Sequence, residues 1–365
     1  MTGRSREHLP ALTGLRFLLA LWVILDHLTG PGMQLDPLAR QLPHPLYALI
    51  RGGYLAVATF FVLSGFVLAR GYGLGGWEAG GLRRYAVARF ARIYPVYALS
   101  LALVAPFMLA DHTPGKPGLL ADYGLVLQGW TGHLPVGWNT PAWSLSCEIF
   151  FYICFPLAAV ALRRWNPFAL AAAACVLTRV LFLVGVRDEW KPLVHFADFA
   201  MGIAAASIYG RIRSSAVAPA GKWLYLPAAA LGMALIAWPG LLPSVVDLNT
   251  ALRPLNALLL VGFALGTGRA AQWLSSTVAV YLGKSSYAMY ILHVPLLWWV
   301  RRCSPHLPAA LYIALVIGFS ALVYRFVEEP ANRYLRGRLA RRPQSEPLSP
   351  KSSARACMAL MQKSM

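Results

Sequence analysis

Apolar segments long enough to cross a lipid bilayer recur along most of this 365-residue chain. A spanning α-helix needs about 20 mostly apolar residues, and somewhat fewer where neighbouring helices line a cavity. The sequence therefore predicts an all-α, polytopic membrane protein with about ten transmembrane helices in a single membrane domain, residues 1–335. The ten segments lie near residues 12–29, 54–72, 93–110, 143–162, 168–186, 193–210, 223–239, 251–267, 279–300 and 307–327.

The composition supports a bilayer environment and argues against a nucleic-acid partner. Hydrophobic residues make up 58% of the chain and charged residues only 13%, which is unusual for a soluble domain. The net charge of +19 would suit nucleic acid if the basic residues formed one solvated face. Instead they stand in short clusters between apolar runs, as topology determinants do. Examples are Arg83-Arg84, Arg163-Arg164 and Arg341-Arg342.

The distribution of Lys and Arg predicts which side of the membrane each loop faces. With ten spans both termini lie on one side, and placing them inside gives the inner side most of the 33 Lys and Arg residues. We therefore expect cytoplasmic termini and a disordered, basic, Ser/Pro-containing tail over residues 336–365. The basic residues assigned to outer loops are Arg40, Arg51, Lys116, Arg187, Lys191, Arg253, Arg301 and Arg302.

The five cysteines show no Cys-x-x-Cys pair, so we expect neither a disulfide framework nor a metal site. No bound cofactor is expected either. The first apolar run resembles a signal sequence, but it contains Arg16 and no cleavage site follows, so we interpret it as a retained membrane helix.

Arg16 and His27 are two costly polar residues in the first predicted membrane helix. Ionisable groups inside a bilayer indicate function by default. Eleven residues separate the two side chains, which places them on one helix face about 16 Å apart along the axis. Imidazole is suited to accept and return a hydroxyl proton at neutral pH, so His27 is a candidate base. The alternatives are snorkelling of Arg16 and a packing role for His27.

Glu148, in the run that begins at Trp143, is predicted to lie in the outer half of the fourth segment at a depth similar to that of His27. A carboxylate there could orient an imidazole, and Trp143 would line the same pocket. The alternative is a structural ion pair, for instance with Arg179. Cys147, beside Glu148, is the residue that could act as a covalent nucleophile.

His293 and Tyr287, in the ninth segment, could add polar groups to the same pocket or simply make helix-packing hydrogen bonds. At the opposite, inner side, Arg89 and Arg92 are spaced i, i+3 and would face together on a helix. Such a pair could bind a di- or triphosphate by forked donors. Basic residues at an inner membrane boundary are also expected from topology alone.

Taken together, residues 9–335 resemble the acyltransferase-3 family of integral membrane O-acyltransferases. The likeness rests on an ordered set of short motifs, each weak alone. They are Arg16 to His27, Phe60-Phe61-Val62-Leu63-Ser64-Gly65-Phe66, Arg89 to Arg92 followed by Ile93-Tyr94-Pro95, Trp143-Ser144-Leu145 to Glu148 and Tyr152, Ser286-Tyr287 to His293-Val294-Pro295, and Val327-Glu328-Glu329-Pro330.

The resemblance implies a multi-pass protein of the bacterial cytoplasmic (inner) membrane. Some members of the family carry a fused SGNH domain, which we do not expect here because only a short polar tail follows the tenth segment. It implies transfer of a short acyl group, with acetyl expected, from cytoplasmic acyl-CoA to a hydroxyl. It also implies that Arg16 and His27 are essential and that Arg89 and Arg92 bind the donor, whereas the roles of Glu148 and His293 are less settled. The expected acceptor is a cell-surface or exopolysaccharide precursor, such as a lipid-linked saccharide. Two alternatives remain, namely acylation of a small secondary metabolite such as a macrolide, and a proton-coupled transporter or flippase of glycan lipids.

Overall fold

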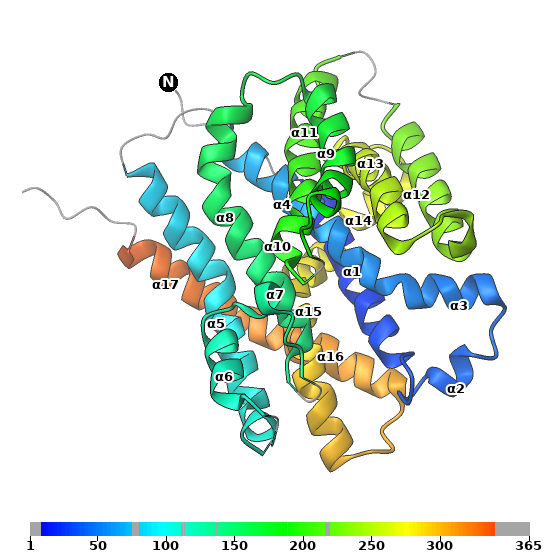
Figure 1. Cartoon of the computed structure of the whole chain (residues 1–365), viewed down its shortest axis with the longest axis vertical. Helices are drawn as coiled ribbons and strands as arrows, with labels where there is room; N and C mark the ends of the chain where they lie inside the picture. Colours follow the sequence, from blue (N-terminus) through cyan, green and yellow to red (C-terminus); the bar gives the residue numbers. More distant parts are fainter. Residues whose placement is uncertain are drawn as a thin grey trace, which may run out of the picture.

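The computed structural model describes residues 9–74, 80–110, 112, 114–135, 138–187, 189–215 and 220–339. Over these ranges the regular secondary structure is helical, with no strand, which confirms the all-α prediction. In the view of Figure 1, α5 and α8 lie on one side of the molecule and α12 on the other, with α4, α11 and α1 between them.

Each of the ten expected segments coincides with a long helix, although the third helix begins earlier than expected. These helices are α1 (Pro10–Leu28), α4 (Ala56–Tyr72), α5 (Gly81–Ala110), α8 (Trp143–Leu162), α9 (Pro167–Leu183), α11 (Phe196–Ile212), α12 (Lys222–Ala237), α13 (Val245–Ala264), α15 (Thr277–Cys303) and α16 (Ala309–Val323).

Shorter helices connect or extend them. They are α2 (Asp36–Ala39), α3 (His44–Arg51), α6 (Lys116–Gly124), α7 (Gln128–Thr131), α10 (Lys191–Val194), α14 (Arg269–Leu274), α17 (Glu329–Leu339), the 3-10 turns η1 (Gly52–Leu55), η2 (Thr140–Ala142) and η4 (Pro239–Leu241), and the π-helical turn η5 (Tyr324–Glu328).

Six helical segments of the described chain are long and apolar enough to cross a membrane. They are Pro10–Leu28, His44–Tyr72, Gly81–Ala110, Thr140–Leu162, Lys191–Ile212 and Ala309–Arg338. The helices α9 and α12 are apolar but shorter. The molecule is therefore a multi-pass membrane protein, while the number of ten crossings and the side of the termini stay predictions.

Apolar and polar side chains are distributed as a lipid environment requires. Leu157 and Leu183 are 78% and 80% exposed, whereas Asp198, Arg253 and Glu328 are at most 2% exposed. In water the opposite arrangement is normal. In lipid, charged groups turn toward the interior of the bundle, where partners can be found.

Helix α1 occupies the middle of the bundle and packs against α15, α4, α13 and α14. Pro10 stands at its first turn, where the missing N–H of proline costs no hydrogen bond. Glycines allow the close approach: a methyl group on Gly14 would overlap the carbonyl of Leu274, and one on Gly283 would overlap the carbonyl of Thr13. Such small-residue contacts are the usual way for helices to pack in lipid.

A second close contact joins α4 and α11 and is reciprocal. A methyl group on Gly65 would meet the Phe199 carbonyl, and one on Gly202 would meet the Val62 carbonyl. The motif glycine Gly65 is therefore needed for backbone approach.

The segment between α5 and α8 contains α6, α7 and η2 among its described residues. Trp138 is fully buried there and packs against Tyr123, with ring centroids 4.9 Å apart. At the other end, α17 continues to Leu339, so the first residues of the predicted tail are helical. The remaining tail, residues 340–365, lies outside the described residues.

We predict that Gly65→Ala destabilises the protein, because the added methyl group overlaps backbone that cannot move without separating α4 from α11. Overpacking of this kind costs about 1–3 kcal/mol. Gly318→Ala in α16 is the control, since no atom lies near its added methyl group. Thermal unfolding in detergent, followed by circular dichroism, should show a lower Tm for Gly65→Ala only. Equal Tm values for the two variants would contradict the packing argument.

Candidate functional site

The largest cavity near the predicted base is lined by His27 and has a volume of about 410 Å³. We call it the His27 cavity. The His27 Nδ1 lies 2.9 Å from the Val23 carbonyl oxygen. A carbonyl can only accept, so Nδ1 carries the hydrogen and Nε2 keeps its lone pair in the neutral ring. The walls of the His27 cavity include Asp26, Tyr54, Thr140, Trp143, Lys191, His195, Asp198, Asn249, Arg253 and Tyr290.

Asp26, next to His27 in the sequence, pairs with Arg51 instead of His27. Its carboxylate accepts a hydrogen bond from Arg51 at 2.6 Å, and Arg51 also donates to the Asp26 carbonyl at 2.7 Å. Arg51 therefore attaches α3 to the end of α1.

His293 lies directly against His27, with ring centroids 4.9 Å apart in an edge-on arrangement. Its Nδ1 contacts the Tyr290 carbonyl at 2.6 Å, and its Nε2 is buried without a hydrogen-bond partner. The ring itself is only 1% exposed. The structure thus places His293 behind the predicted base, in contact with it.

Arg16 lies in a small central cavity of about 40 Å³ together with Glu148, Ser286, Tyr287 and Tyr290. Its Nε is buried without a partner, and no ion pair of Arg16 occurs among the described residues. The carboxylates of Glu148 and Glu328 nevertheless act on it electrostatically. Glu148 accepts a hydrogen bond from Tyr152.

The prediction that Glu148 shares a pocket with His27 is wrong. Glu148 lies in the central cavity with Arg16, whereas Trp143 lines the His27 cavity. The physical reason is the rise of α8: five residues separate Trp143 from Glu148, which corresponds to about 7.5 Å along the axis. The alternative partner Arg179 is also wrong, because it pairs with Asp247 at 2.9 Å.

Arg89 lines a third cavity of about 230 Å³, the Arg89 cavity, together with Arg16 and Arg70. Its guanidinium carbon lies 5.5 Å from the centre of the Tyr152 ring and 5.7 Å from that of Tyr72. Two or more cationic side chains around one cavity suit an anionic ligand such as a phosphate.

The i, i+3 spacing predicts that Arg92 faces the same way as Arg89, but Arg92 does not line the Arg89 cavity. It forms an ion pair with Glu328, a buried residue of the π-helical turn η5. Its guanidinium also lies 5.2 Å from the centre of the Tyr287 ring. A single turn of α5 therefore presents one arginine to a cavity and the other to an internal carboxylate. Sequence reasoning assigned no role to Glu328.

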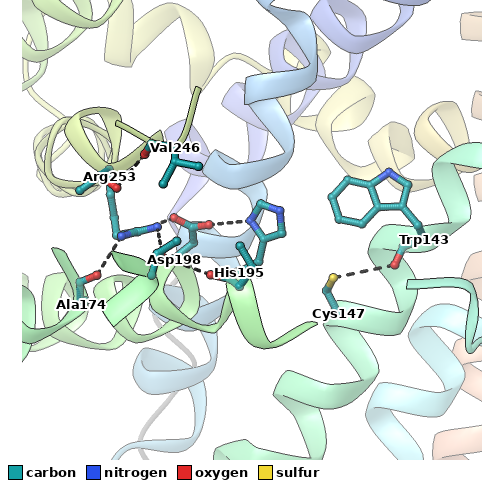
Figure 2. A network of polar contacts seen from close by, with 10 residues as sticks. Trp143, Cys147, Ala174, His195, Asp198, Val246 and Arg253 are labelled. Carbon is teal, nitrogen blue, oxygen red and sulfur yellow. Dashed lines mark hydrogen bonds and ion pairs between the residues drawn. The ribbon is translucent and has the colours of Figure 1, made fainter. Parts of the chain in front are cut away.

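Sequence reasoning also missed a polar network on the wall of the His27 cavity, shown in Figure 2. His195 Nδ1 lies 2.8 Å from Asp198, and Arg253 Nε donates to the other Asp198 oxygen at 2.7 Å. Arg253 was assigned to an outer loop, but it is buried in α13 and donates also to Ala174 and Thr178. The available signal was the i, i+3 spacing of His195 and Asp198 at the start of a membrane segment.

Cys147 is fully buried, and its sulfur contacts the Trp143 carbonyl at 3.8 Å. Among the described residues that line the three cavities, Cys147 is not found. This geometry argues against Cys147 as a nucleophile.

The fold and the polar interior together define a multi-pass helical membrane protein with an imidazole-lined and an arginine-lined cavity. The chain belongs to the acyltransferase-3 family, because the family model described as an acyltransferase domain matches residues 9–325. This confirms the resemblance inferred from the motifs.

Two relatives illustrate the match. Acyltransferase MdmB of Streptomyces mycarofaciens is 32% identical over 90% of this chain and 92% of its own length. Peptidoglycan O-acetyltransferase OatA of Listeria monocytogenes is 24% identical over 91% of this chain, which covers 57% of that protein. No solved structure matches the chain.

We predict that Glu328→Gln lowers the free energy of unfolding by about 3–5 kcal/mol, because Arg92 is left as a buried, unpaired cation. Glu329→Gln is the matched control: its carboxylate pairs with Arg325 and Arg333 at the surface, so its Tm should match that of the wild type. A thermal shift assay in detergent compares the two. Similar Tm values for both variants would show that the Arg92–Glu328 pair is not an internal anchor.

Proposed function

We propose that this acyltransferase moves a short acyl group, acetyl in the first instance, from cytoplasmic acyl-CoA to a hydroxyl of a cell-surface or exopolysaccharide precursor in the bacterial cytoplasmic membrane. One observation supports this above the others: the three cavities adjoin. Arg16 lines both the Arg89 cavity and the central cavity, and Val57 and Tyr290 line both the central cavity and the His27 cavity. A cation-lined cavity thus lies near a cavity that an imidazole borders.

The geometry supports the following sequence of bonds. Arg89 and Arg16 bind phosphates and the carbonyl end of the donor arm, and the thioester reaches the His27 cavity. The acceptor oxygen attacks the thioester carbonyl carbon while His27 Nε2 takes its proton. The C–S bond then breaks, and the CoA thiolate leaves and receives that proton. The products are an ester and CoA, and His27 is restored.

In this proposal Glu148 acts on Arg16. Held by Tyr152, it orients the guanidinium, and Arg92 supports the donor site through Tyr287 and Glu328. His293 contacts His27 from behind.

A small secondary metabolite, such as a macrolide, is the second candidate acceptor. The walls of the His27 cavity include apolar side chains such as Val23, Leu134, Phe182 and Val246 beside the polar ones. Such a mixture suits a compact, partly apolar molecule. Mass spectrometry of surface glycans and culture extracts separates the candidates when wild-type cells are compared with cells that lack this protein. The molecule that loses its ester in the deletion strain is the acceptor.

We predict that His27→Ala lowers the transfer rate by about 10²–10⁴-fold, the usual contribution of general base catalysis. The KM for acetyl-CoA should stay unchanged, because donor binding relies on the arginines. Protein reconstituted in liposomes with radiolabelled acetyl-CoA provides the measurement. Flux of a glycan lipid without consumption of the thioester would instead support the transporter alternative.

We predict that Arg16→Lys raises the KM for acetyl-CoA by about tenfold or more, because a lysine cannot replace the planar, bidentate guanidinium. The same liposome assay measures the effect, with Arg325→Lys, an exposed surface arginine, as the control. Full activity of Arg16→Lys would restore the snorkelling interpretation of Arg16.

A further inference from the structure

His195 is a second imidazole on the wall of the His27 cavity, and the proposed reaction leaves it without a role. The inference drawn from it rests on that proposed function. The His195 side chain is 17% exposed and lines the His27 cavity. It stands at the junction of α10 and α11, where Asp198 lies one helical turn further along.

Three contacts fix the orientation of the His195 ring. Asp198 holds Nδ1 at 2.8 Å. The ring centroid lies 5.0 Å from that of Phe61 and 5.5 Å from that of Trp143. Figure 2 shows the imidazole between the Asp198 carboxylate and the Trp143 indole. A side chain held by a carboxylate and two aromatic rings is preorganised for a partner at its remaining nitrogen.

Nε2 of His195 is that remaining nitrogen. The carboxylate can only accept, so Nδ1 carries the hydrogen and Nε2 of the neutral ring carries a lone pair. No hydrogen bond of Nε2 occurs among the described residues. The cavity wall thus presents a fixed hydrogen-bond acceptor.

The ion pair of Arg253 with Asp198 favours a His195 that accepts a hydrogen bond over one that takes a proton. In a catalytic triad the carboxylate stabilises the imidazolium that forms. Here the Asp198 charge already faces the Arg253 guanidinium at 2.7 Å, and both side chains are 2% exposed. A charged His195 would place two cations around one carboxylate in an apolar interior, which is costly.

Arg253 does not need His195 for its own hydrogen bonds, so holding Arg253 in place does not explain why His195 is there. Arg253 is bound by one Asp198 oxygen, the Ala174 carbonyl and the Thr178 hydroxyl. The other Asp198 oxygen is the one that holds His195. The network therefore extends from a satisfied structural pair toward the cavity.

We propose that His195 is a positioning residue that accepts a hydrogen bond from a second hydroxyl of the acceptor, while His27 takes the proton of the reacting hydroxyl. The acceptor is then a molecule with at least two hydroxyl groups. One imidazole that takes a proton and another that accepts a hydrogen bond, at separate points of one cavity, fix which hydroxyl reacts. The Trp143 ring, which lines the same cavity, supplies an apolar face for the body of the acceptor.

The test compares His195→Gln with His195→Asn, because each replaces a different ring nitrogen. The Gln amide oxygen can reach the Nε2 position, whereas the Asn amide can keep the Asp198 hydrogen bond but does not reach the cavity. Extracts of cells that lack this chain serve as the acceptor source, and radiolabelled acetyl-CoA serves as the donor. The half-saturating amount of extract is measured for protein in liposomes, with Arg179→Gln, a surface ion-pair variant, as the control.

We expect His195→Asn to raise the half-saturating amount of extract about tenfold, the loss of one hydrogen bond. His195→Gln and Arg179→Gln should stay within about threefold of the wild type, and the KM for acetyl-CoA should be constant throughout. Unchanged half-saturation for His195→Asn would overturn the proposal. A wild-type half-saturating amount for His195→Asn together with a raised one for His195→Gln would also overturn it, because that result indicates a structural role through Asp198.

Asp198→Asn provides a second, independent variant. An amide in place of the carboxylate can donate to Nδ1 and so move the ring hydrogen to Nε2. Acceptor half-saturation should then rise as it does in His195→Asn, whereas a lower Tm with normal half-saturation would leave Asp198 as a counterion only. Failure of the proposed function is recognised separately, because wild-type protein would then transfer no label.

Discussion

The close backbone contact of α1 with α15 and α14 is the constraint on which the rest of the molecule depends. Gly14 and Gly283 permit it, and no larger side chain fits at either position. All three cavities have walls from α1: His27 lines the largest, and Arg16 lines the other two. A shift of α1 relative to α15 would therefore move the candidate base and the candidate donor-binding cation together.

Some buried charged side chains in this interior form ion pairs, and others do not. Asp198 with Arg253, and Glu328 with Arg92, are ion pairs between different helices. Arg16 forms no such pair among the described residues and, like Arg89, keeps a buried Nε without a hydrogen-bond partner. Because a buried cation without a bound counter-ion is costly, a site of this kind gains stability when an anionic or carbonyl ligand binds. These two arginines line the Arg89 cavity and thus suit a ligand there.

The sequence predicted the helical class and the approximate position of each long helix, whereas the roles of Arg16 and His27 stay predictions. Apolar periodicity and segment length are local properties, and they carry this information. The partners were not predictable in the same way. Glu148 lies with Arg16, Arg92 lies with Glu328, and Arg253 lies with Asp198. These pairings depend on helix tilt and on neighbours distant in sequence, neither of which a residue pattern contains.

The two histidines that contact each other show how the same residue type acquires different roles. Both use Nδ1 on a backbone carbonyl of their own helix, Val23 for His27 and Tyr290 for His293. Only His27 borders the large cavity, whereas His293 Nε2 is sealed inside the bundle. Of the two rings, His27 is therefore the one placed to meet a substrate in the cavity, and His293 packs against it from inside the bundle.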